Sequence, residues 1–160
     1  MSNPSLPFLA DSITHYLLEQ LDVTRLPVPV REILEAPPQA LAHDLSLSGG
    51  LALGVARWIR LLDGQGVVFV NGQTTPEEPV RRFAMAIATF YGICSSKGGR
   101  FAGLPSGGDT HALARYFARA LLMPEHLLPQ GWEIMPDEEL ASYCDVPMNV
   151  IQERRKDLLI

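Results

Sequence analysis

The sequence contains few of the side chains that bind metals or form disulfides. Its 160 residues include two cysteines and four histidines: Cys94 and Cys144, and His15, His43, His111 and His126. The cysteines are too far apart to form a Cys-x-x-Cys motif, and each histidine lacks a second one at ligand spacing. This excludes a zinc ribbon or a disulfide framework and predicts two buried thiols. We expect the chain to use no metal and no other cofactor.

Basic residues and long apolar segments are also scarce. The 13 Lys and Arg residues face 18 Asp and Glu residues, a formal charge of -5 that opposes general binding to nucleic acid or to an anionic membrane surface. The longest uncharged helical segment, 83–96, is too short to span a bilayer. Residues 1–7 contain no basic stretch ahead of an apolar one, so we expect no secretory signal and a cytoplasmic location.

The first half of the chain predicts two helices and a β-hairpin. Apolar residues at helical spacing indicate a helix over 9–23, and a short helix over 30–35 is bounded by prolines. Two β-favouring segments, 51–62 and 67–71, are joined by the turn 63–66, whose two glycines permit positive φ angles. We therefore expect a small antiparallel sheet.

The second half predicts helices. A capping box at 75–78 begins a long helix that ends near Ser96, and the glycine-rich segment 97–108 indicates a mobile loop. Asp109 or Thr110 can cap a further helix that Pro124 closes. The expected fold class is α+β in a single domain, with N-terminal helices and a link, a β-hairpin, two core helices and a helical tail over 1–50, 51–75, 76–124 and 125–160.

The two core helices carry a recognisable pattern. Residues 82–92 read RFAMAIATFYG, and residues 112–124 read ALARYFARALLMP. In order and spacing they resemble the two active-site helices of the ImmA/IrrE family of zinc metallopeptidases, which read approximately R-F-T-x-A-H-E-x-G-H and E-A-N-x-F-A-x-x-L-L-M-P. The resemblance covers most of the chain and implies a zincin-type domain.

The zinc chemistry of that family is missing from the aligned positions. An HExxH helix works because two histidines one turn apart hold the metal and the glutamate between them activates the bound water. The two histidine positions fall on Ile87 and Tyr91, the base position on Ala88 and the third ligand on Leu113. Because these substitutions are mostly apolar together, we expect packed side chains to fill the former metal site. No catalytic residue is therefore predicted.

One helix face offers a candidate binding surface. His111, Arg115 and Arg119 recur every four residues and predict a basic ridge on the face opposite Leu113, and Arg100 lies in the glycine-rich segment before it. A solvated helix face explains the same pattern. Because like charges at this spacing repel each other, we expect an acidic side chain or a bound anion to compensate them.

The resemblance implies a regulatory protein that is not an enzyme. Members of the family typically cleave helix-turn-helix repressors, so a relative without ligands is expected to keep a protein-binding surface, with such a repressor as its candidate partner. Two alternatives stay open: a hydrolase that uses Asp109 and His111, and a DNA-binding regulator that uses the C-terminal helix pair. The candidate DNA contacts in that pair are Asn149, Gln152, Arg155 and Lys156. The partner's identity, the oligomeric state and the pathway do not follow from the sequence.

Overall fold

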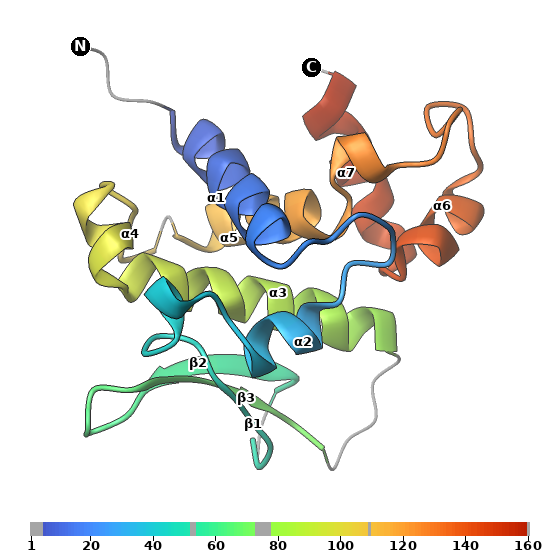
Figure 1. Cartoon of the computed structure of the whole chain (residues 1–160). Helices are drawn as coiled ribbons and strands as arrows, with labels where there is room; N and C mark the ends of the chain where they lie inside the picture. The colour runs from blue at the N-terminus through green and yellow to red at the C-terminus, as the bar shows by residue number, and fades with distance from the viewer. Residues whose placement is uncertain (1–4, 52–53, 73–77, 109, 160) are drawn as a thin grey trace.

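The computed structural model describes residues 5–51, 54–72, 78–108 and 110–159. These residues form seven α-helices, two 3-10 helices (η) and three strands, so the expected α+β class is confirmed (Figure 1). In chain order the elements are α1 (Leu6–Gln20), α2 (Val30–Glu35), η1 (Gln39–Leu41), β1 (Leu47–Ser48), β2 (Ala56–Arg60), β3 (Gly66–Val70), α3 (Glu78–Ser95), α4 (Lys97–Phe101), α5 (Thr110–Leu122), η2 (Glu125–Leu127), α6 (Asp137–Cys144) and α7 (Met148–Leu159).

The sheet contains the expected hairpin and one further strand. β2 pairs with β3 in antiparallel register, with Trp58 opposite Val68. β1 pairs with the other side of β3 in parallel, so the sheet is mixed and its order is β1-β3-β2. The expectation of a purely antiparallel sheet was wrong because β1 has only two residues, too few for a periodic sequence signal. The first predicted strand was also too long, since β2 begins at Ala56.

Helix α3 lies at the centre of the molecule (Figure 1). The sheet packs on one side of it, and α1 and α5 cover the other side. The Phe90 and Phe117 rings are fully buried with their centroids 4.9 Å apart, which joins α3 to α5. On the sheet side, a Cβ at Gly92 would lie 2.7 Å from Trp58 Nε1, so only glycine lets β2 approach the helix this closely.

The glycine-rich segment after α3 is not simply a loop. Lys97–Phe101 forms the short helix α4, with Ser96 as its N-cap: the Ser96 hydroxyl accepts a hydrogen bond from Gly99 N at 3.0 Å. Glycine is a poor helix former, but a Cβ at Gly99 would lie 2.1 Å from Ile93 O. Close packing of α4 against the end of α3 therefore requires glycine at position 99, although glycine lowers the helix propensity of α4.

The other predicted helices agree with the structure to within a few residues. α1 begins three residues earlier than expected, because Ser5 caps it by accepting a hydrogen bond from Phe8 N at 3.4 Å. α2 and α5 lie where they were predicted, and the expected helical tail contains α6 and α7. The predicted capping box at 75–78 falls mostly outside the described residues, as does Asp109. No helix within the described ranges is both long and apolar enough to cross a membrane.

Candidate functional site

Two of the three positions aligned with zinc ligands, Ile87 and Tyr91, lie beside an open cavity. Ile87, Ala88 and Tyr91 of α3 line one side of a space of about 470 Å³, and His111 of α5 also borders it. Ile87 and Tyr91 are only partly buried. The expectation that packed side chains fill this site was therefore wrong. The space between α3 and β2 is open although Ile87 and Ala88 are apolar.

The remaining predicted positions on the two core helices are in the interior. Phe83 and Cys94 are buried on α3, and Leu113 is 8% exposed on α5. Leu113 is not among the residues that line the cavity. Tyr91 therefore lies in an accessible, polar part of the site, whereas Leu113 belongs to the apolar core.

Tyr91 and His111 form the polar centre of the cavity. The Tyr91 hydroxyl lies 3.3 Å from His111 Nδ1, and which atom donates depends on the histidine tautomer. Both residues were candidates from the sequence, but their contact was not predicted because they are 20 positions apart. The pair can hydrogen-bond a bound polar group. Asp109, the other residue of the alternative hydrolytic site, lies outside the described residues.

The residues of the described ranges hold no cluster suited to metal binding or thiol chemistry. Among them, no group of three or more His, Cys, Asp or Glu side chains could hold a metal ion. Burial raises the pKa of Cys94 to about 12, and burial likewise raises the pKa of Cys144 to about 12. Thiols with such pKa values are protonated near neutral pH, so neither cysteine is poised to act as a nucleophile.

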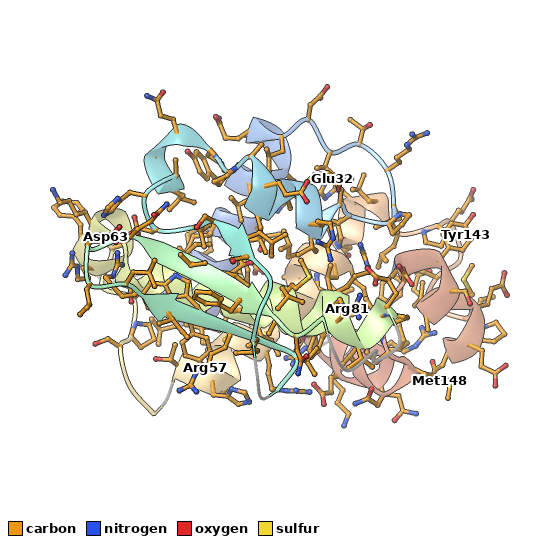
Figure 2. All side chains as sticks on the ribbon, turned by 90° about the horizontal axis from the view of Figure 1, so that it is seen from below. Glu32, Arg57, Asp63, Arg81, Tyr143 and Met148 are labelled. Atoms are coloured by element: carbon orange, nitrogen blue, oxygen red, sulfur yellow. The ribbon has the colours of Figure 1, made fainter. Side chains whose placement is uncertain are left out.

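Strand β2 forms the other border of the cavity and is an edge strand. Ala56, Arg57 and Trp58 line the cavity, and Figure 2 shows Arg57 at the β2 side of the sheet. These residues were not predicted as site residues, because no local sequence signal shows that β2 packs against α3. Their position became clear only once α3 was seen to pack on β2.

The hydrogen-bond register shows which groups face outward from β2. Leu61 N donates to Gln65 O at 2.8 Å, and Asn71 N donates to Val55 O at 3.0 Å. Between positions 55 and 61, the backbone N–H and C=O groups of the odd-numbered residues therefore bond to β3. Those of the even-numbered residues point to the outer edge of β2. Within the part of the chain that the structure describes, no strand pairs with that edge. An unpaired edge can accept an extended peptide from a partner.

The predicted basic ridge is not a free surface. Arg115 and Arg119 both face acidic residues of α7: Arg115 Nη2 lies 3.2 Å from Glu153 Oε2, and Arg119 Nη1 lies 2.9 Å from the same oxygen. Arg119 also binds Asp157, and its side chain is only 12% exposed. The two arginines therefore join α5 to α7. Of the four candidate binding residues, His111 lines the cavity, and Arg100 is exposed on α4 but is not among the cavity residues.

Two of the four candidate DNA-contacting residues in the C-terminal helix pair bond within the protein. Arg155 Nη1 donates to Trp132 O at 2.8 Å, and Arg155 Nε donates to Asp137 Oδ1 at 3.0 Å. Gln152 Nε2 donates to the other oxygen of Asp137 at 3.4 Å. These contacts fix the segment before α6 against α7. Asn149 and Lys156 remain exposed, too few for a basic recognition surface.

No family model and no curated protein matches this chain. Among solved structures, it is similar to a Mycobacterium tuberculosis transcriptional regulator, with a TM-score of 0.53 and 17% sequence identity. The match covers 93% of this chain and 46% of that one, so this chain spans about half the length of the regulator. At this identity the similarity shows a shared fold.

Proposed function

We propose that the chain is a ligand-free relative of the ImmA/IrrE metallopeptidases that binds a protein partner without cleaving it. The observation that carries this proposal is the open cavity at two of the aligned ligand positions, Ile87 and Tyr91, directly beside the unpaired edge of β2. A peptidase needs both features: an edge that holds an extended chain and a hollow beside it for the reacting group. This protein has both features but lacks metal-binding side chains at Ile87, Tyr91 and Leu113.

The proposed partner is a helix-turn-helix transcriptional repressor. The resemblance to the family supports this choice, since repressors of this kind are typical substrates there. The fold shared with a transcriptional regulator is compatible with a regulatory role. In this interpretation an extended segment of the repressor adds to the outer edge of β2, and one of its side chains enters the cavity near the Tyr91–His111 pair. The bound repressor is held or shielded rather than cut.

The test fills the cavity from its wall. Ile87→Trp places a large side chain at a half-buried position of the cavity wall, and Val80→Trp makes the same change at a 39% exposed position elsewhere on α3. The wild-type protein is used to capture partners from an extract of the source cells, and any captured helix-turn-helix protein is purified and titrated against all three proteins. We expect Ile87→Trp to weaken its binding tenfold or more and Val80→Trp to leave it unchanged. Capture that yields no helix-turn-helix protein, or equal affinity of the two variants, would overturn the proposal.

The Tyr91–His111 pair is the observation that favours a second function, an atypical hydrolase. A histidine held by a tyrosine can move a proton, although Asp109 falls outside the described residues. Turnover of a peptide or ester substrate library that disappears in His111→Ala would support this alternative. The internal bonds of Gln152 and Arg155 argue against the third possibility, DNA binding through α7.

A further inference from the structure

A second cavity lies between α1, α5, η2 and α7 and shares no residue with the first. It also measures about 470 Å³, within the range of small-molecule pockets. Its polar wall includes Asp11, Tyr116, Glu125, His126 and Arg154. Neither the proposed partner binding nor the family resemblance makes use of this cavity.

Arg154 is the most unusual group in the cavity wall. It is only 6% exposed, and its Nε donates to Met123 O at 3.0 Å. Its Nη1 is 3.9 Å from Asp157, too far for a hydrogen bond, and within the described ranges its two Nη groups have no hydrogen-bond acceptor. Burial lowers the pKa of Arg154, because the charged form is poorly solvated there. A carboxylate can accept two parallel hydrogen bonds from such a guanidinium.

Asp157 does not satisfy Arg154 because it already binds another arginine. Arg119 donates from Nε and Nη2 to the two oxygens of Asp157, at 2.6 and 3.0 Å. This bidentate pair uses the preferred geometry of the carboxylate. The Nη donors of Arg154 are thus left facing the cavity, where an anionic group would bind them.

The cavity also contains negative charge on other elements. Both oxygens of Asp11 on α1 lie 3.0 Å from the Tyr116 hydroxyl, and Glu125 of η2 is exposed at the rim. Burial raises the pKa of Tyr116, as does its hydrogen bond to Asp11, so the phenol keeps its proton and remains a donor. A carboxylate has about four acceptor positions, which leaves Asp11 free to accept further hydrogen bonds from an ammonium group.

We propose that this cavity binds a free α-amino acid, with its carboxylate on Arg154 and its ammonium group toward Asp11 and Glu125. A simple anion would use only Arg154, and a simple cation would use only the two acids. A zwitterion satisfies both. The side chain would lie against Ala120, Pro124 and Leu158, with the stacked His15 and His126 rings, 5.5 Å apart, beside it.

The experiment screens the twenty amino acids individually by calorimetric titration against the full chain. The tightest binder is then compared with its N-acetyl derivative, which lacks the ammonium charge, and its methyl ester, which lacks the carboxylate. We expect each derivative to bind at least tenfold more weakly, since a charged hydrogen bond is lost in each case. Asp11→Asn should weaken binding of the amino acid by a similar factor and preserve an acceptor for Tyr116.

Glu19→Gln provides the matched control, because Glu19 is exposed on the same helix and is not among the cavity residues. It should leave affinity unchanged. The proposal is overturned if no amino acid binds, if the N-acetyl derivative binds as well as the parent, or if Asp11→Asn and Glu19→Gln behave alike. If no amino acid binds, the proposed partner binding at the other cavity is unaffected, so the two proposals are tested independently.

Discussion

Arg119 holds Asp157 through two parallel hydrogen bonds, with Nε 2.6 Å from Oδ2 and Nη2 3.0 Å from Oδ1. The two side chains are 12% and 13% exposed. Arg119 also reaches Glu153 at 2.9 Å, so a single guanidinium on α5 binds two acids of α7. A residue that the sequence presents as part of a surface ridge is instead an interior connection between two helices.

We expect Arg119→Ala to destabilise the protein by about 3 kcal/mol, because it leaves the nearly buried Asp157 carboxylate without its main partner. Arg115→Ala is the comparison, since Arg115 shares Glu153 but is 31% exposed. Its loss should cost about 1 kcal/mol or less. Urea unfolding of the three proteins measures the difference, and equal midpoints for the two variants would contradict this account of the pairing.

Two adjacent glycines of α4 should respond in opposite ways to the same substitution. A Cβ at Gly98 would meet only Ser96 Oγ at 3.9 Å, whereas a Cβ at Gly99 would lie 2.1 Å from Ile93 O. Gly98→Ala should therefore stabilise the helix by up to about 1 kcal/mol. Gly99→Ala should destabilise by about 1–3 kcal/mol, since backbone must move. Thermal unfolding distinguishes them, and α4 would be misplaced if both changes had the same sign.

Stability should fall as pH rises above 9, because of the two cysteines. Burial raises the pKa of Cys94 and that of Cys144 from 9.0 to about 12, so between these values the unfolded chain loses protons that the folded chain keeps. The stabilisation of the folded state by the two protonated thiols is complete below pH 9 and is lost progressively toward pH 12. From pH 8 to pH 10 the loss should be about 1 kcal/mol per thiol. Urea titrations at both pH values test this, and replacing both cysteines with alanine should flatten the slope.

The wild-type chain should hold no stoichiometric zinc, and a chelator should leave its melting temperature unchanged. Introducing the zinc-binding side chains of the resembled family at the aligned positions should change this. The variant Ile87→His/Ala88→Glu/Tyr91→His/Leu113→Glu supplies three ligands and the base, and should bind about one zinc per chain by elemental analysis. The same variant without Leu113→Glu should bind zinc much more weakly. If the two variants retain equal amounts, the alignment of α5 with the family's second helix is wrong.

A single histidine at position 87 should be tolerated. Ile87 is half-buried and borders an open cavity, so an imidazole there can remain hydrated. We expect Ile87→His to cost less than about 1 kcal/mol in denaturant titration. In a filled, apolar site the same change would cost about 1–3 kcal/mol, because the ring would be buried without a partner. A large loss would indicate that the cavity is closed in solution.

Much of the secondary structure follows from the sequence because its signals are local. The apolar spacing of α3 and α5, the glycine-containing turn of the hairpin and the proline that follows α5 depend on residues within a few positions of each other. The absence of zinc ligands at Ile87, Tyr91 and Leu113 is likewise evident from the printed residues. These features predict the fold class and place the candidate site on α3 and α5.

Tertiary structure decided how these elements meet and what their polar groups do. β1 exists only because β3 offers it a partner, and α4 forms where Gly99 can approach Ile93 O. Arg119 meets Asp157 across 38 residues, and His111 meets Tyr91 across 20. Periodicity assigns a side chain to a face of its own helix, but the neighbour on that face comes from elsewhere in the chain. For this reason the connection from α5 to α7 and the two cavities became visible only in the folded protein.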